Sequence, residues 1–234
     1  MIDLKFFSKT ERYARYISGI SSVILFLLGG YFVFSSPSDY QQGEFVRIMY
    51  VHVPSAWMAL GVYVFMGVCS ITYIIWRNNF LDLLANQAAL IGAVFAAVTL
   101  VTGAMWGKPI WGAWWVWDAR LTSMLILFFF YLGYIALLNA VREDSMKNDA
   151  PAILAIIGLV NIPIIKFSVN MWSTLHQPAS IIKVSGPAVH PSMMVPLLLM
   201  FFACVAFFVF ILIFRVNTEI MRKKILRIKH ISSS

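Results

Sequence analysis

Charged residues are scarce in this chain of 234 residues, where Asp, Glu, Lys and Arg together make up 12% of the sequence. Soluble domains carry about 25% charged residues, so this composition excludes an ordinary soluble domain. Apolar residues make up 61% of the chain and fall into long blocks separated by short polar segments. The shortage of charge and the long apolar blocks together predict a membrane protein.

Cysteine is also rare in this chain. The two cysteines, Cys69 and Cys204, each lie inside an apolar block, without a CxxC partner and without a CxxCH motif. This spacing argues against a redox role and against covalent attachment of haem. We therefore interpret both thiols as small packing residues.

Six apolar blocks are long enough to cross a hydrocarbon core of about 30 Å, which needs around 20 helical residues. They cover approximately residues 16–36, 53–76, 86–106, 120–141, 151–168 and 193–214. The first block follows a basic segment without a small-residue cleavage site, which predicts a retained anchor helix. The fifth block is short and contains Pro163, which predicts a kink or a tilt. The predicted fold is an all-α polytopic membrane protein, one six-helix transmembrane domain over residues 1–234.

The basic residues indicate how the chain is oriented. Thirteen of the eighteen Lys and Arg residues lie in the two tails and the even-numbered loops, and five lie in or beside the odd-numbered loops. Positive charge marks the cytoplasmic side of a membrane protein, and this pattern explains the net charge of +8 better than nucleic-acid binding does. We therefore expect both termini in the cytoplasm and, in a bacterial inner membrane, the odd-numbered loops in the periplasm.

Five of the eight tryptophans lie between residues 106 and 120, in the sequence WGKPIWGAWWVWDAR. Four residues of this segment share one face of a helical projection: Trp111, Trp114, Trp115 and Asp118. We therefore expect a turn at Lys108, Pro109 and Gly112, followed by a short helix on the outer interface, with Trp117 on its flank. An aromatic belt would spread Trp over both interfaces. Clustering in one loop favours a platform for a planar ligand such as a porphyrin, a quinone ring or a sterol.

Two histidines distinguish among these ligands. His52 lies at the entry to the second predicted span, and His176 lies in the third outer loop at a comparable depth. Two neutral imidazoles at one level could supply both axial ligands of a haem iron, whereas a quinone or a sterol needs no such pair. His190, at the entry to the sixth span, is better explained as a helix-entry residue.

Two arginines are candidates for the acidic edge of haem, because its propionates need cationic partners when they leave water. Arg47 lies five residues before His52, and Arg120 lies two residues after Asp118. Arginine binds a carboxylate through two parallel hydrogen bonds, which lysine cannot do. A structural pair between Arg120 and Asp118, and a solvated loop charge for Arg47, remain open as alternatives.

The segment WGAWWVWD at residues 111–118 resembles the signature of the WWD-domain family, the haem-handling membrane proteins of cytochrome c biogenesis. With YVHVPSA at residues 50–56 and STLHQP at residues 173–178, the chain is similar to the six-span haem exporter protein C family of the system I pathway. This likeness extends from about residue 40 to about residue 180.

The resemblance implies a function as well as a fold. Such a protein holds haem b on the periplasmic face and loads it onto a periplasmic haem chaperone, beside ABC transporter subunits and a small single-span protein. No bond within the haem molecule is made or broken in this transfer, so an enzyme is not expected. The resemblance implies that the iron ligands are His52 and His176, and that the remaining site residues are Trp111, Trp114, Trp115, Trp117, Asp118, Arg120 and Arg47.

Three other functions predict features that the sequence lacks or shows only weakly. A b-type cytochrome or a quinone-reactive subunit predicts paired histidines inside the spans, which the sequence lacks. A permease for haem or another small molecule predicts polar residues along a path, and only Asn161 and Lys166 are notable within the spans. A haem-attaching lyase of the same superfamily needs larger periplasmic domains than this chain offers.

Overall fold

The computed structural model describes residues 4–143, 149–171, 176 and 189–232. Its helices are α1 Leu4–Ser35, the 3-10 helix η1 Glu44–Ile48, α2 Met49–Trp76, α3 Asn79–Trp111, α4 Ala119–Glu143, α5 Ala150–Gly158, α6 Asn161–Met171 and α7 Pro191–Ser232. Within the described residues, six helical segments are long and apolar enough to cross a membrane: Thr10–Ser35, Glu44–Trp76, Asn79–Trp111, Ala119–Ala140, Ala150–Asn170 and Pro191–Ile231. The predicted fold class is confirmed.

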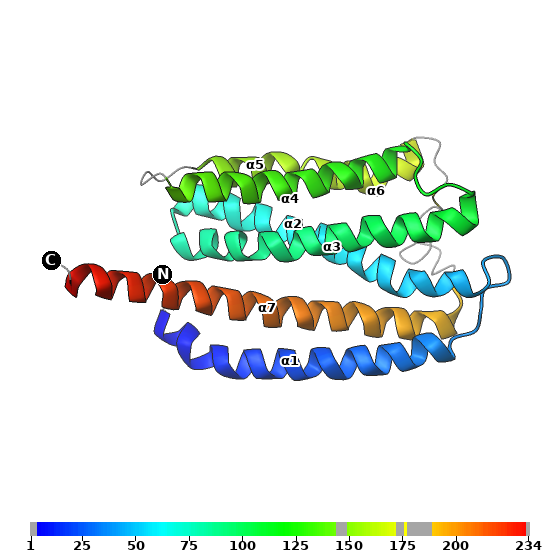
Figure 1. Ribbon diagram of the computed structural model, residues 1–234, viewed down its shortest axis with the longest axis horizontal. Helices are drawn as coiled ribbons and strands as arrows, with labels where there is room; N and C mark the ends of the chain where they lie inside the picture. The colour runs from blue at the N-terminus through cyan, green and yellow to red at the C-terminus, as the bar shows by residue number, and fades with distance from the viewer. Residues whose placement is uncertain (1–3, 144–148, 172–175, 177–188, 233–234) are drawn as a thin grey trace.

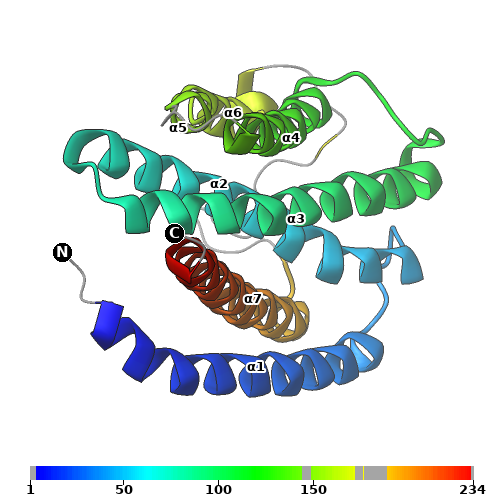
Figure 2. The same cartoon turned by 60° about the vertical axis from the view of Figure 1, so that its left-hand side comes forward.

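The helices form three layers (Figures 1 and 2). Helices α2 and α3 pack against each other as the middle layer, α4 with α5 and α6 covers one face, and α7 covers the other face. Helix α1 packs along α7 on the outside. The middle layer therefore contacts both of the others.

The middle layer is packed closely because α3 is rich in small side chains. Ala85, Ala88, Ala89 and Ala96 are fully buried on α3, and small residues let membrane helices approach closely. The large ring of Tyr131 fits against Gly92, where an added Cβ would lie 2.3 Å from the ring. Alanine and glycine on α3 thus make room for aromatic side chains from its neighbours.

The fifth span is broken, as Pro163 predicted. Helix α5 ends at Gly158 and α6 begins at Asn161. Pro163 has no N–H to donate to the carbonyl of Leu159. A Cβ added at Gly158 would lie only 1.9 Å from the hydroxyl oxygen of Tyr63. A missing hydrogen bond and a close aromatic contact together explain the kink.

Both chain termini lie at one end of the bundle (Figure 1). The connections from α1 to α2 and from α3 to α4 lie at the opposite end, which we call the site end. Helix α3 continues to Trp111, about one turn past its predicted end. Helix α7 continues far beyond residue 214 and is exposed from Met221 to Ile231. The extension of α3 brings the first of the clustered tryptophans into a regular helix.

Candidate functional site

The tryptophan-rich segment is not the short helix that we expected. Helix α3 runs through Lys108 and Pro109 and ends at Gly112, whose φ of 76° is left-handed and whose N–H donates to the carbonyl of Lys108 over 3.0 Å. Glycine adopts this conformation without steric cost. The following residues, up to Asp118, are not helical. The prediction of a flat helix was wrong because Gly112 ends α3 and no new helix begins before α4.

Asp118 explains why the next helix, α4, begins only at Ala119. Its Oδ1 accepts a hydrogen bond of 2.8 Å from the N–H of Leu121, and its carbonyl accepts one of 3.0 Å from Thr122. These are the bonds of an N-cap residue, whose own backbone is not helical. Asp118 therefore begins α4 and cannot belong to one helical face with Trp111.

His52 lies in the first turn of α2 and faces α3. Its Nδ1 is 3.1 Å from Oγ1 of Thr102. Its ring meets the indole of Trp106 edge to face, with centroids 5.7 Å apart and planes at 72°. The Nε1 of Trp106 donates to Oε1 of Gln42 over 3.0 Å. His52 is thus held by α3 on two sides.

His176 is held by the other end of the tryptophan segment. Its Nδ1 is 3.2 Å from Oδ2 of Asp118, and its ring meets that of Trp111 with centroids 4.9 Å apart. The imidazole is 21% exposed and the carboxylate is 8% exposed. Burial lowers the pKa of His176 below its usual value, although the hydrogen bond that the imidazole donates to the Asp118 carboxylate opposes this shift. The imidazole is therefore neutral at pH 7, and the neutral form is the one that binds metals.

Two glycines on α3 bring these groups together. A Cβ at Gly103 would lie 3.0 Å from Cε1 of His52, and one at Gly107 would lie 2.9 Å from the ring of Trp111. Residues four apart share a helix face and are separated by about 6 Å along the axis. The ring of His52 and the indole that contacts His176 therefore lie one turn apart on the same face of α3.

Arg120 lies near both histidines. Its guanidinium interacts electrostatically with Asp118, with His176 and with His52. His52 and His176 also interact electrostatically with each other. The structure thus brings five of the predicted site residues together, although they come from three separate parts of the sequence: His52, Trp111, Asp118, Arg120 and His176.

Arg47 has a different set of partners. Its guanidinium donates to the backbone carbonyls of Val33 and Ser36 at the end of α1, and it pairs with Glu44. Basic side chains commonly satisfy the last carbonyls of a helix in this way. In the structure, Arg47 joins the end of α1 to η1.

His190 caps a helix. Its Nδ1 is 2.8 Å from Oγ of Ser192 and accepts a hydrogen bond of 3.3 Å from the N–H of the same residue. Its carbonyl accepts from Met193 over 2.9 Å at the start of α7. These contacts agree with a helix-entry role.

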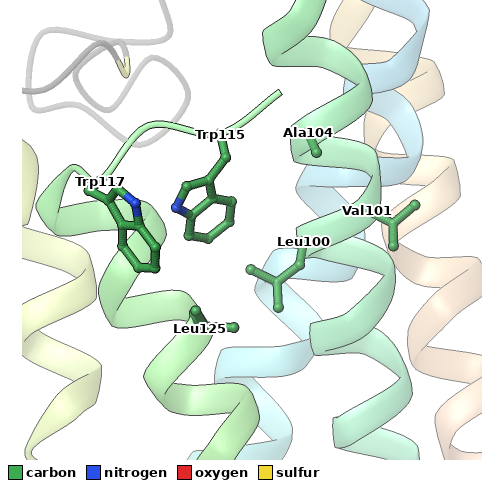
Figure 3. Close-up of a pocket in the computed structure, with 6 residues that line it drawn as sticks. All are labelled: Leu100, Val101, Ala104, Trp115, Trp117 and Leu125. Carbon is green, nitrogen blue, oxygen red and sulfur yellow. The ribbon is translucent and has the colours of Figure 1, made fainter. Parts of the chain in front are cut away.

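Trp115 and Trp117 lie between α3 and α4. The rings of Trp115 and Trp117 meet edge to face, with centroids 5.5 Å apart, and together with α3 and α4 they line an apolar cavity of about 440 Å³ (Figure 3). The remaining lining residues are Leu100, Val101, Ala104 and Leu125. Trp114 is 58% exposed and Trp117 is 77% exposed. The clustered tryptophans therefore lie in two places: Trp111 contacts His176, whereas Trp115 and Trp117 line this open cavity, which we call the groove.

The nitrogen of Trp115 is buried. Within the described part of the chain its Nε1 has no hydrogen-bond partner, and in Figure 3 it is turned toward the ring of Trp117. An indole N–H can be stabilised by the face of an aromatic ring. The edge-to-face geometry therefore accounts for this buried donor.

Sequence reasoning missed Thr102, Gly103 and Trp106, which surround His52. They occupy positions i, i+1 and i+4 near the outer end of the third predicted span. A hydroxyl and a glycine within a tryptophan-bearing span are a local signal, but only the packing of α2 on α3 shows what they contact.

Residues 3–230 match the family model described as Heme exporter protein C. The chain belongs to this family. It is 42% identical to Heme exporter protein C of Bradyrhizobium diazoefficiens, covering 100% of this chain and 90% of that protein. It is 45% identical to Heme exporter protein C of Escherichia coli K12, with coverage of 76% and 72%. A putative cytochrome c biosynthesis ccmC-like mitochondrial protein of Marchantia polymorpha is 48% identical, with coverage of 81% and 80%.

Family membership confirms the resemblance found in the tryptophan motif. The family handles haem within a membrane and is not an enzyme family, so the expectation of a non-enzymatic protein is confirmed as well. The matched region contains the tryptophan segment together with His52 and His176.

Proposed function

We propose that this chain binds haem b as cargo between His52 and His176 and passes it to a periplasmic haem chaperone during cytochrome c maturation. The observation that carries the proposal is the placement of both imidazoles along one face of α3 at the site end. They are 124 residues apart in the sequence, yet His52 lies against Gly103 of α3, and the indole that contacts His176 lies against Gly107, one turn further along the same helix. Each also contacts a tryptophan of α3.

The chemistry of the site fits a haem. Two imidazole nitrogens suit the two axial positions of the iron, and indole rings suit the apolar faces and edges of the macrocycle. Arg120 is the better placed arginine for a propionate, since it lies beside both histidines. Arg47 would serve a propionate only by giving up bonds to the end of α1.

The position of the site suits transfer to another protein. Bundle cytochromes hold their haem between facing helices within the core. Here His176 and the tryptophan segment belong to the connections at the site end, and Trp114 and Trp117 are largely exposed. We infer that the chaperone docks on this exposed aromatic surface and takes haem when it changes the position of an iron ligand.

The proposal also includes the location of the chain in the membrane and its partner proteins. The excess of Lys and Arg in the tails and even-numbered loops favours cytoplasmic termini and a periplasmic site in a bacterial inner membrane. Related proteins are named for cytochrome c biosynthesis. We propose that the chain works there with ABC transporter subunits and a small single-span protein.

The test is a haem titration of the purified protein followed by its visible spectrum. Removal of an axial ligand should abolish the low-spin spectrum, so His52→Ala and His176→Ala should each lose this spectrum and bind haem more weakly. His190→Ala is the matched control, because His190 caps α7. Normal low-spin haem in both ligand variants, or loss only in His190→Ala, contradicts the proposed ligand pair.

A further inference from the structure

We propose that Thr102 is a positioning residue for haem ligation: it sets the tautomer of His52, so that Nε2 is the atom that faces the iron. This inference rests on the proposed function, in which His52 is an axial ligand. Thr102 itself touches neither the iron nor the porphyrin in this proposal. It acts only through the imidazole.

The hydroxyl of Thr102 has one proton, and it donates this proton to backbone carbonyls of its own helix, α3. Oγ1 lies 2.6 Å from the carbonyl of Val98 and 3.3 Å from that of Thr99, and it donates to these acceptors. The same oxygen is 3.1 Å from Nδ1 of His52. The shorter bond takes the hydroxyl proton, so the oxygen offers His52 a lone pair.

A neutral imidazole carries one N–H and one unprotonated nitrogen. Since Thr102 accepts, Nδ1 of His52 carries the proton and Nε2 keeps its lone pair. Metal-binding histidines generally donate their second nitrogen to a protein acceptor, which fixes both tautomer and ring orientation.

The ring cannot readily turn away from this arrangement. Gly103 leaves just enough space for Cε1, because a Cβ there would lie 3.0 Å from it. On another side the indole of Trp106 meets the ring edge to face. A single face of α3 therefore supplies the acceptor, the clearance and the packing that orient His52.

The two proposed ligands then differ in their second partners. His176 has a carboxylate, Asp118, and His52 has a neutral hydroxyl. A carboxylate partner raises the basicity of a ligating imidazole more than a hydroxyl does. We infer that His176 is the stronger electron donor of the pair and His52 the more rigidly placed one.

The first test needs no haem. Long-range ¹H–¹⁵N correlation on the haem-free protein labelled at histidine reports which ring nitrogen carries the proton. We expect the Nδ1–H form of His52 in the natural protein and in Thr102→Ser, and a shift toward the Nε2–H form in Thr102→Val. Thr99→Val is the matched control, because the Thr99 hydroxyl donates to Phe95 on its own helix. An Nε2–H form in the natural protein overturns the proposal, whatever the folding of the variants.

The second test measures haem binding and the low-spin spectrum of the same set. Loss of a second partner of a metal-ligating histidine typically weakens binding by about 10–100-fold. We expect this for Thr102→Val, recovery to within about threefold in Thr102→Ser, and no change in Thr99→Val. Unchanged tautomer, affinity and spectrum in Thr102→Val refute the positioning role. If His52→Ala instead leaves haem binding intact, the proposed function fails while the tautomer result stands.

Discussion

The two ends of the bundle use polar side chains differently. At the end that carries the termini, polar groups bind one another across helices: Arg77 pairs with Asp149 at 2.7 Å, and Tyr73 donates to the same carboxylate over 3.1 Å. At the site end, His52 and His176 each contact a protein acceptor through Nδ1. The first arrangement joins helices, whereas the second fixes the orientation of two imidazole rings.

The aromatic residues differ in the same way. In the bundle interior Tyr63, Tyr131 and Tyr134 are fully buried, and the hydroxyl of Tyr131 donates to the carbonyl of Ala59 over 2.7 Å. At the site end Trp114 and Trp117 remain mostly exposed. Large exposed aromatic surfaces are typical of sites that bind a partner or a ligand. The comparison therefore predicts that substitutions at the site end change haem binding, whereas those at the other end change only stability.

The largest expected effect in this comparison concerns Asp118. Asp118→Asn keeps a good N-cap for α4 but removes the carboxylate beside His176, so haem binding should weaken by about 10–100-fold with little loss of stability. Asp118→Ala should also lose the cap, which costs about 0.5–2 kcal/mol. Haem titration and thermal unfolding of both variants measure the two effects separately. Equal haem affinity in Asp118→Asn and the natural protein would show that the carboxylate acts only as a cap.

A smaller effect is expected from the groove tryptophans. An aromatic contact contributes about 0.5–1.5 kcal/mol beyond its buried area, so Trp115→Ala and Trp117→Ala should each weaken haem binding by roughly 2–10-fold. Trp76→Ala, at the C-terminal end of α2, is a control because Trp76 is 68% exposed and far along the helix from His52. If the groove variants bind haem normally and the spectrum is unchanged, the platform is confined to Trp106 and Trp111.

The pH dependence of the haem-free protein follows from His176. Burial lowers its pKa in the folded state, so below its ordinary value of about 6.5 the unfolded chain binds a proton that the folded chain does not. The free energy of unfolding therefore falls as the pH falls from 7 toward 5. Thermal unfolding across this range measures the loss, and His176→Gln should remove part of it. Because Asp118 raises the pKa of His176, Asp118→Asn should make the loss steeper.

The smallest effect is expected at the opposite end. Arg77 is exposed, and the hydrogen bond from its guanidinium to Asp149 raises its pKa. Exposed ion pairs contribute little to stability, so Arg77→Ala should lower the unfolding midpoint by less than about 4 °C and leave haem affinity unchanged. A tenfold loss of haem affinity in this variant would contradict the separation of the two ends.

Much of the fold follows from local properties of the sequence. The six spans are predictable because each apolar block must by itself match the thickness of the bilayer. The break between Gly158 and Asn161 follows in part from Pro163, which cannot donate a hydrogen bond to the carbonyl of Leu159. The prediction of a helix over the tryptophan segment was wrong. A helical face pattern over eight residues is a weak signal, and the chain instead ends α3 at Gly112 and begins α4 at the N-cap residue Asp118.

The candidate site is only partly readable in the sequence. His52 and His176 could be placed on one side of the membrane, since the number of spans and the bias of Lys and Arg determine the side. Their shared contact with α3 could not be predicted, because it depends on Gly103 and Gly107 facing the same way and on how α2 packs there. The contacts of Arg47 could not be predicted either, since its neighbours along the chain gave no sign that it binds the end of α1.

By itself, the sequence determined the number of membrane helices, the grouping of the tryptophans and both histidines at one end, and the family to which the chain belongs. Each of these depends on composition or on motifs within a short stretch of chain. Only the tertiary structure decided which tryptophan meets which histidine, and that Thr102 and Asp118 are the partners of the two imidazoles. The reason is physical: hydrogen bonds and ring contacts act over a few ångströms, and helix packing alone brings residues so distant in the chain within that range.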